Sequence, residues 1–354
     1  MRVMLLYPIS VGGERGDMRR MFRIAEMILH RGHELFILAP DFKIGSGYKL
    51  FVTGVRFVDR ILLCLQLLIL YPLAYMRFKP DLILVRTPLF LLIATFFKIF
   101  NRKPLVVDSF MPYPRRVIKT NFKLTLHYML YKLCVKHIDL FTVEDKVKYR
   151  YVIQNGAPKQ KVFLLPPGIK LRQVPQVYNK RMFYLSFLYK NRKFEMFLKK
   201  LASRREDLPE FKLDICGYGP EEDRYKKMVK ELGLEDNVHF LGRVSNERIS
   251  KIIKNYRVCL LMNTPGQKAY DYLSYGKPIL ALKSKYNEYV LDGAALLAKD
   301  MDDYVTKMGL ILKSKRLTRL YASKSKKLAK ERYEIGYVSE KFDRALRNII
   351  SKTN

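Results

Sequence analysis

The segment "RVCLLMNTPGQKAYDYLSYGKPIL", residues 257–280, holds one complete alternation of strand and helix. An apolar run is followed by a Pro-Gly turn, a helical segment, a stop at Gly276 and a second apolar run. This order predicts two parallel strands of one sheet joined by a short helix. The first amides of that helix, at Gly266 to Lys268, lack intrahelical partners, and the helix dipole adds positive potential there. The turn is therefore a candidate anion site.

The side chains of this helix fit a nucleotide better than a simple anion. The amides of Gly266 and Gln267 can approach a diphosphate, and Lys268 can add a full positive charge. Asp271, one turn further, offers a carboxylate that can accept both hydroxyls of a ribose. We therefore expect a diphosphate and a ribose to bind at this strand end.

Strands alternate with helices along most of the chain, which predicts an α/β protein with parallel sheets. A chain of 354 residues exceeds the usual size of one core and favours two domains. The proline-rich stretch "LPPGIKLRQVPQVYNK" falls between two such alternations. We predict a Rossmann-like domain over 1–165, a linker over 166–180, a second Rossmann-like domain over 181–334, and a helix over 335–354 that packs back toward the first. Two doubly wound sheets facing a cleft would hold ligands at their strand ends.

The composition points to an acidic partner without naming it. Sixty-seven Lys and Arg against 33 Asp and Glu leave a formal charge of +34, which attracts nucleic acid, anionic membranes or phosphorylated substrates. The basic runs carry neither an RNA-binding signature nor zinc-finger spacing, so we expect no nucleic-acid partner. Four isolated cysteines and a strand-like N-terminus without a signal-peptide pattern predict a cytoplasmic protein.

Two apolar runs raise the question of a membrane: "ILLCLQLLILYPLAYM", residues 61–76, and "PLFLLIATFFKIF", residues 88–100. Both are shorter than the roughly 18 to 20 residues of a spanning helix, and Pro72 interrupts the first. Burial inside the first domain is the favoured interpretation. Basic residues around both runs keep peripheral docking on an anionic membrane open: Arg60, Arg77, Lys79, Lys98, Arg102 and Lys103.

Two further glycine-bearing loops follow strands. "GYGP" contains Gly217 and Gly219, which give either close access for a ligand or an ordinary tight turn. "GGERG" contains Gly12, Gly13 and Arg15, where a dinucleotide-binding loop would lie, although its spacing is not G-x-G-x-x-G. The Asp300-Met301-Asp302 motif directly precedes a helix, so we expect Asp to cap that helix, with no metal bound.

Several motifs in order resemble the retaining glycosyltransferases of family four, which have the GT-B fold. They are "GGERGDMRRMFRIAEMILHRGHELFILAP", "KPDLILVRTP", "VFLLPPGI", "LDICGYGP", "NVHFLGRV" and the segment quoted first. The resemblance implies a nucleotide-sugar site in the second domain. Asn263 takes the place of the first acidic residue of the family signature, and Asp271 that of the Glu that binds the ribose. Gly266 matches the glycine whose neighbouring amides hold the distal phosphate.

The resemblance also assigns the remaining donor-site residues. Gly217 and Gly219 belong to the "GxGP" loop, and Arg243 lies beside the strand whose backbone reads the base. Family members clamp the diphosphate with an Arg and a Lys. Here Ser186-Phe187 stands where Gly-Arg is expected, and the candidates for the Lys position are Lys190, Arg192 and Lys193. Gly12, Gly13 and Arg15 would contact an acceptor or a phosphate.

The resemblance therefore implies transfer of a sugar from a nucleoside diphosphate, with retention of configuration, without a metal and without a separate cofactor. The basic and apolar first half suggests a glycan or lipid-linked acceptor at the inner face of the cell membrane. Two alternatives stay open. One is a catalytically inert homologue that binds a sugar nucleotide or a lipid, and the other is a basic nucleic-acid-binding protein.

Overall fold

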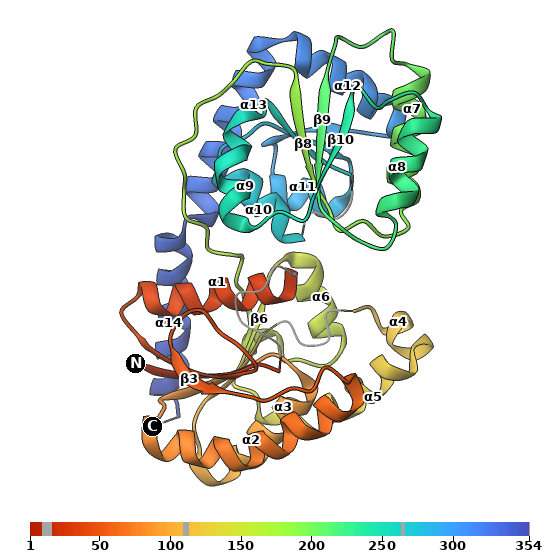
Figure 1. Cartoon of the computed structure of the whole chain (residues 1–354). Helices are drawn as coiled ribbons and strands as arrows, with labels where there is room; N and C mark the ends of the chain where they lie inside the picture. Colours follow the sequence, from red (N-terminus) through yellow and green to blue (C-terminus); the bar gives the residue numbers. More distant parts are fainter. Residues whose placement is uncertain (9–15, 109–112, 263–265, 354) are drawn as a thin grey trace. The chain divides into compact units, whose positions relative to one another are not determined.

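The computed structural model describes residues 1–8, 16–108, 113–262 and 266–353 (Figure 1). The chain divides into two compact units, each built on one parallel sheet. Unit 1 comprises Met1–Gly168 and Ile335–Asn354, and unit 2 comprises Ile169–Glu334. The segment from residue 169 to 180, expected as part of the linker, thus groups with unit 2, and the C-terminal helix groups with unit 1.

Unit 1 has a seven-stranded sheet in the order β3-β2-β1-β4-β5-β6-β7. Its strands are β1 (Arg2–Leu6), β2 (Glu34–Ala39), β3 (Ser46–Lys49), β4 (Leu82–Val85), β5 (Leu105–Asp108), β6 (Leu140–Val143) and β7 (Val162–Leu164). Its helices are α1 (Gly16–His30), α2 (Arg56–Phe78), α3 (Pro88–Asn101), α4 (Arg115–Thr120), α5 (Phe122–Cys134), α6 (Lys146–Gln154) and α14 (Ile335–Ser351).

Unit 2 has a six-stranded sheet in the order β10-β9-β8-β11-β12-β13, the doubly wound order that reverses direction at its first strand. Its strands are β8 (Arg181–Leu185), β9 (Lys212–Cys216), β10 (Val238–Gly242), β11 (Val258–Leu261), β12 (Ile279–Leu282) and β13 (Ala295–Ala298). Its helices are α7 (Arg192–Ser203), α8 (Glu222–Glu231), α9 (Asn246–Ile252), α10 (Gly266–Ser274), α11 (Lys285–Leu291), α12 (Met301–Lys313) and α13 (Lys315–Leu328).

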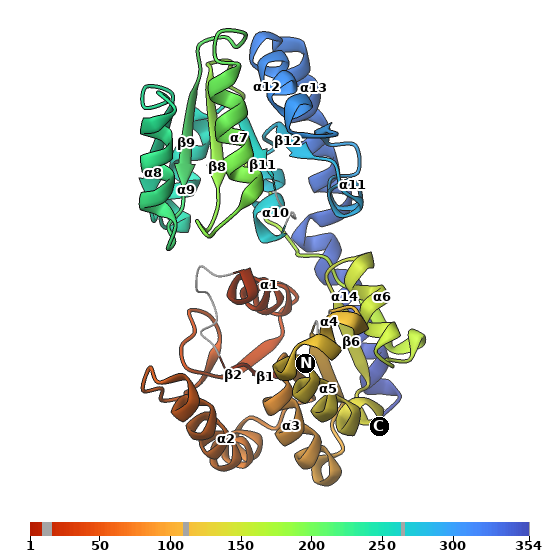
Figure 2. The ribbon, with the colours of Figure 1, turned by 90° about the vertical axis from the view of Figure 1, so that its right-hand side faces the viewer.

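Alternate residues of the unit 1 strands enter two cores, because successive side chains of a strand point to opposite faces. Val3 and Leu5 pack with α1 and α14, whereas Met4 and Leu6 pack with the layer of α2, α3 and α5. Figure 2 shows these three helices on the opposite side of the sheet from α1. Both faces are covered, so the strands are apolar throughout, as parallel strands usually are.

The helix over the first apolar run is longer than the sequence analysis allowed. The structure extends it to the 23 residues of α2, and Pro72 does not end it. Within the described residues, Val58–Phe78 is the one helix with the length and apolar composition to cross a membrane, at a mean hydropathy of 1.8. Burial, the favoured interpretation, holds for one face only, because Ile69 is 64% exposed while Leu67 is fully buried.

The C-terminal helix is held in unit 1 by a buried polar contact as well as by apolar packing. His33 Nε2 lies 2.6 Å from Asp343 Oδ1, and Arg347 Nε donates to Asp343 Oδ2 over 3.0 Å. Burial alone would raise the pKa of Asp343, but the hydrogen bonds from Arg347 and His33 outweigh it and lower that pKa. Phe342 and Leu346 of α14 are buried in the same core as Ile24 of α1.

Replacing Asp343 should loosen α14. In Asp343→Ala the buried His33 loses its partner, which costs about 1–3 kcal/mol, so amides of residues 335–351 should exchange faster in hydrogen-exchange mass spectrometry. Glu340→Ala, which removes a surface ion pair with Arg344 on the same helix, should change exchange little. Because the folded pKa of Asp343 lies below its unfolded value, the difference should persist at neutral pH and shrink as pH falls through the folded value. Equal exchange in both variants at pH 7 would contradict this account.

Candidate functional site

The candidate site in unit 2 lies where its sheet reverses strand order. β8 has β9 on one side and β11 on the other, and the connections after β8 and β11 leave the sheet at the same edge. Ligands of doubly wound sheets bind at this switch point, outside the carboxyl ends of the strands. The helix α10, expected from the opening segment, begins at this edge at Gly266.

Helix α10 binds both backbone groups of the last residue of β8. Lys268 Nζ donates to the carbonyl oxygen of Leu185 over 3.3 Å, and the Leu185 amide donates to Tyr272 Oη over 2.9 Å. Tyr272 is buried, as is Gln267 of the first turn. The predicted phosphate-binding helix α10 and the end of β8 are therefore held together by specific contacts.

Lys268 is the most unusual cation of this site. Desolvation by the surrounding protein lowers its pKa from 10.5 to about 8. Its ammonium lies 5.7 Å from the centre of the buried Tyr184 ring and donates a hydrogen bond to the neutral carbonyl of Leu185. A diphosphate at the start of α10 would supply the negative charge that favours the ammonium form.

The Gly-Lys-Pro exit of the opening segment has a structural role. Gly276 adopts φ +58°, a conformation that suits glycine, and its amide closes α10 by donating to Leu273. Lys277 is buried, and its Nζ donates to the carbonyl oxygens of three residues: Pro175, Lys254 and Tyr256. The lysine thereby connects the segment that enters unit 2 to the segment that precedes β11.

Gly217 and Gly219 make room for protein backbone. A Cβ at Gly217 would lie 1.7 Å from the carbonyl oxygen of Ser186, and one at Gly219 would lie 2.2 Å from that of Leu188. The Gly217 amide donates to Gly242, and the Leu188 amide donates to the residue between the two glycines. The tight-turn interpretation therefore accounts for both glycines, and contact with a ligand stays a prediction.

An aromatic group stands where the resemblance expects an arginine. Phe187, which is 53% exposed, meets Tyr218 edge to face with ring centres 5.3 Å apart. The guanidinium of Arg243 lies over the Tyr218 ring, 5.0 Å from its centre. The loops after three neighbouring strands, β8, β9 and β10, thus contribute one residue each to this partly exposed aromatic group. Lys190 and Lys193 are exposed beside it, at the start of α7.

Some predicted site residues cannot be placed. Gly12, Gly13, Arg15 and Asn263 lie outside the described residues. Asp271 is half-buried on α10, one turn beyond Lys268. The structure therefore brings Gly266, Gln267, Lys268 and Asp271 onto one short helix, and the roles of all these residues stay predictions.

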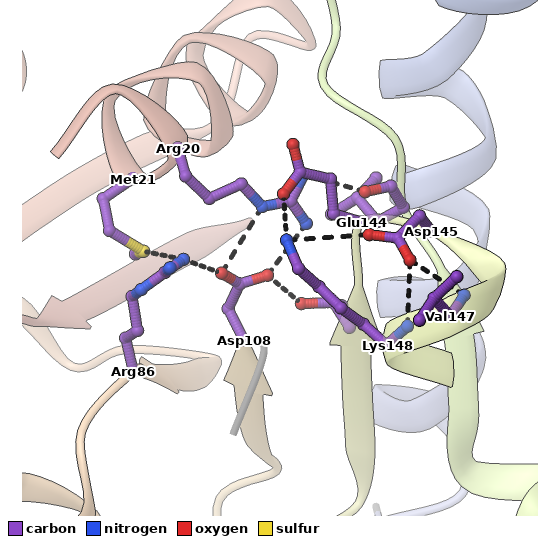
Figure 3. Close-up of polar contacts among 10 residues, drawn as sticks. Arg20, Met21, Arg86, Asp108, Glu144, Asp145, Val147 and Lys148 are labelled. Carbon is purple, nitrogen blue, oxygen red and sulfur yellow. Dashed lines mark hydrogen bonds and ion pairs between the residues drawn. The ribbon is translucent and has the colours of Figure 1, made fainter. Parts of the chain in front are cut away.

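Unit 1 contains a charged cluster that the sequence analysis did not single out (Figure 3). Arg86, Asp108 and Glu144 follow or end β4, β5 and β6, three neighbouring strands. Asp108 is fully buried and accepts from Arg20 of α1 over 2.8 Å, from Arg86, and from Thr142 over 2.7 Å. The cluster lies at the carboxyl ends of the strands, the edge at which this kind of sheet binds ligands.

The cluster balances buried charges of both signs. Burial alone would raise the pKa of Asp108, but Arg20 and Arg86 together lower it. Burial acts in the same direction on Glu144, and Lys148, Arg20 and Arg86 again reverse it. Both carboxylates are therefore ionised at neutral pH. The signal in the sequence was a charged residue directly after an apolar strand, as in "LILVR", "LVVD" and "LFTVE".

The expected capping role of the D-x-D motif is confirmed. Asp300 precedes α12, and its Oδ1 accepts from the Asp303 amide over 2.9 Å. Across the part of the chain that the structure describes, no three His, Cys, Asp or Glu side chains come together as metal ligands would.

Comparison with known proteins agrees with this architecture. A crystal structure of the Anabaena protein HepE in complex with UDP-glucose superposes with a TM-score of 0.76 at 15% identity, over 98% of this chain and 100% of that one. WaaG, described as a glycosyltransferase involved in lipopolysaccharide biosynthesis, gives 0.69 at 15% identity, over 96% and 98%. A curated "Uncharacterized glycosyltransferase" of Haemophilus influenzae is 24% identical over 228 residues, 61% of this chain. The match spans 62% of that relative, less than two thirds of its length.

Two doubly wound parallel-sheet units of this kind define the GT-B fold of glycosyltransferases, as the resemblance predicted. Residues 172–331 match the model of the family described as "Glycosyl transferases group 1". The matched range includes α10, the loop after β8 and the aromatic group. The narrower assignment to family four stays a resemblance.

Gly217→Ala should destabilise unit 2, because the new methyl group cannot coexist with the Ser186 carbonyl oxygen. The shifts of backbone and side chains that such overpacking forces cost about 1–3 kcal/mol of stability, so the thermal unfolding temperature should fall. Gly309→Ala is the matched control, since its methyl group would meet side chains and no backbone atom of another segment, Leu208 at 3.1 Å and Pro209 at 3.9 Å. An unchanged unfolding temperature in Gly217→Ala would contradict the structural role.

Binding of a nucleoside diphosphate should depend on the charge of Lys268. Desolvation lowers the pKa of Lys268 to about 8, and a bound diphosphate should raise it, so binding above this pH should require uptake of a proton. Affinity measured by calorimetry should therefore be steady below pH 8 and fall by up to about tenfold per pH unit above it. Lys268→Arg, which stays charged, should flatten the profile. The same decline in Lys268→Arg would assign it to another group.

Proposed function

We propose that this protein transfers a sugar from a nucleoside-diphosphate donor bound to unit 2 onto a glycan or lipid-linked acceptor, with retention of configuration. The observation that carries the proposal is the position of Lys268, desolvated at the start of α10 and bonded to the last residue of β8. The group 1 family domain covers this site. The structural relative HepE is in complex with UDP-glucose, a donor of the proposed class.

The proposed transfer requires stabilisation of the negative charge on the leaving diphosphate and positioning of the donor and acceptor. The bond between the anomeric carbon and the diphosphate oxygen breaks, and a bond from that carbon to an acceptor hydroxyl oxygen forms. The hydroxyl proton passes to the leaving phosphate, which needs no protein nucleophile. Preorganised cations and amides in a desolvated site are effective at stabilising such developing charge. Lys268 and the first amides of α10 would do so, with Lys190 or Lys193 contributing from α7, and Asp271 would bind the ribose.

The charged cluster of unit 1 supports a polar acceptor group. Arg86 and Lys148 are partly exposed, with 19% and 27% of their side chains accessible, while Asp108, the partner of Arg86, is inaccessible. A cation fixed by a buried carboxylate can hold an acceptor hydroxyl or phosphate in a defined position. Structural relatives such as WaaG act in lipopolysaccharide biosynthesis, which fits the proposed acceptor class. We further propose that transfer needs no metal and takes place at the cytoplasmic face of a membrane.

A second candidate is a homologue that binds a sugar nucleotide without turning it over. Phe187 favours it, because an apolar, 53% exposed ring occupies the position where the resemblance expects a phosphate-binding Arg. The edge-to-face pair with Tyr218, together with Arg243, would then serve binding of a base or sugar without supplying charge to a leaving group.

Thermal unfolding with a panel of nucleoside diphosphates, with and without magnesium, tests the donor site. One of them at 100 times its Kd should stabilise the protein by about 2.7 kcal/mol, without magnesium. Lys268→Met should lose most of the shift, and Lys299→Met, at an exposed site of the same unit, should keep it. Absence of a shift with every nucleoside diphosphate would contradict the proposal.

Turnover separates the transferase from the inert homologue. The sugar nucleotide that stabilises the protein should label lipids or glycans of a membrane extract, and Asp271→Ala should reduce the rate at least tenfold. Binding without labelling in any extract would favour the inert homologue.

A further inference from the structure

Helix α2 presents an apolar surface on the side where a soluble helix normally has polar residues. Its outward side chains recur at helical spacing and are each at least 44% exposed: Ile61, Leu65, Leu68, Ile69, Leu73 and Met76. No charged residue lies between Arg60 and Arg77. The outward face of α2 is therefore apolar over its whole middle part.

The two neighbouring helices repeat this pattern. α2 packs on α3, and α3 packs on α5, on one side of the unit 1 sheet (Figure 2). The exposed apolar residues of α3 are Leu92, Phe96, Ile99 and Phe100, and those of α5 are Phe122, Leu126, Met129 and Leu133. Together with the α2 residues they form the apolar face. Phe122 is 86% and Phe100 70% exposed. Single exposed apolar residues are common, but a contiguous patch of this kind usually marks an interaction site.

The packing of α2 excludes a helix that crosses a bilayer while unit 1 stays folded. Leu63, Leu67 and Tyr71 are buried against the sheet, so one side of α2 belongs to the core of unit 1. A helix with one side in a protein core and the other side apolar can lie flat in the interfacial region of a bilayer.

The charges around the apolar face identify its partner. Exposed cations lie on the three helices or close to their ends: Arg60, Arg77, Lys79, Arg102, Lys119, Lys132 and Lys136. Residues 56–138 contain no Glu and only three Asp. Each Asp has a partner inside the protein, since Asp59 accepts from Thr53, Asp81 from the Arg2 amide, and Asp108 from Arg20. The rim is therefore positive.

We propose that the apolar face docks unit 1 onto an anionic lipid bilayer, with the apolar side chains at the level of the acyl chains and the cations among the headgroups. A bilayer supplies apolar depth and negative charge together. A second copy of this chain would bring two positive rims together and leave them without counter-charges. The surface belongs to unit 1 alone and does not depend on the donor site. Its use for reaching a lipid-linked acceptor rests on the proposed function.

The chain has no tryptophan, so a single introduced indole reports on insertion. Ile69→Trp should show a blue-shifted emission on vesicles of phosphatidylcholine with 30% phosphatidylglycerol, and brominated acyl chains should quench it. Leu310→Trp, at a 51% exposed position on α12 of unit 2, is the matched control and should show neither effect. Binding to the anionic vesicles should be at least tenfold tighter than to pure phosphatidylcholine. Equal behaviour of the two indoles would overturn the proposal.

Two sets of variants separate the apolar and the charged contributions. Ile69→Glu with Leu73→Glu should lower vesicle binding at least tenfold, while Leu310→Glu should leave it unchanged. Arg77→Gln with Lys79→Gln should weaken binding and reduce its sensitivity to salt. A natural chain that forms a dimer in solution and binds no vesicles is the opposite outcome. If Ile69→Glu with Leu73→Glu then converted this dimer to monomers, the result would overturn the proposal in favour of a second copy.

Donor binding provides the independent check. Ile69→Glu with Leu73→Glu should retain the thermal shift with the nucleoside diphosphate that stabilises the natural chain. If this variant loses vesicle binding but keeps the thermal shift, the loss can be assigned to the apolar face and not to damage at the donor site. A natural chain that binds vesicles but no nucleotide would contradict the proposed function and leave the docking surface standing.

Discussion

The contact between α10 and the end of β8 fixes the geometry of the candidate site in unit 2. Leu185 is the last residue of β8, and side chains of α10 occupy both of its backbone polar groups, the carbonyl oxygen through Lys268 and the amide through Tyr272. These bonds fix the start of α10 against the central strand at the point where strand order reverses. They also explain why Lys268 is desolvated, because the ammonium must reach the strand end to make its bond. Position, electrostatics and the chemistry of the site follow from one packing constraint.

Much of the fold could be predicted because parallel strands covered on both sides are apolar along their whole length. "RVMLL", "LFILA" and "LILV" are such runs, and each is a central strand. β3 could not be predicted in this way, since "SGYK" carries a glycine at 47 and has exposed ends. That glycine is needed because a Cβ there would lie 1.9 Å from the Ile37 carbonyl oxygen. Close backbone approach depends on the neighbouring strand, which a local pattern does not contain.

The site was predictable to the extent that it lies within one segment. Gly266 to Asp271 are consecutive in the chain, so their common helix followed from the alternation of strand and helix. The charged cluster of unit 1 brings together residues up to 124 positions apart, from Arg20 to Glu144, which only the folded sheet makes neighbours. For Gly217 the sequence left close access for a ligand and a tight turn both open. The Ser186 carbonyl oxygen, which a Cβ would approach to 1.7 Å, accounts for the glycine, and contact with a ligand stays a prediction.

The outer helices of the two units show that the apolar face is a local property of unit 1. α2 and α13 both cover a parallel sheet and both bury one side. The outward residues of α13 are mostly Lys and Arg, with "KRLTRLYASKSKKL" as its full sequence, whereas the middle of α2 has no charge at all. The outward side chains of α13 are thus suited to water, whereas those of α2 are suited to an apolar environment. Both helices bury an apolar inward side against their sheet, so the packing of the core does not account for the difference between their outward sides. In unit 1 the exposed cations Arg60 and Arg77 stand at the two ends of the uncharged stretch, and the proposed contact with an anionic bilayer would account for this combination of an apolar centre and a positive edge.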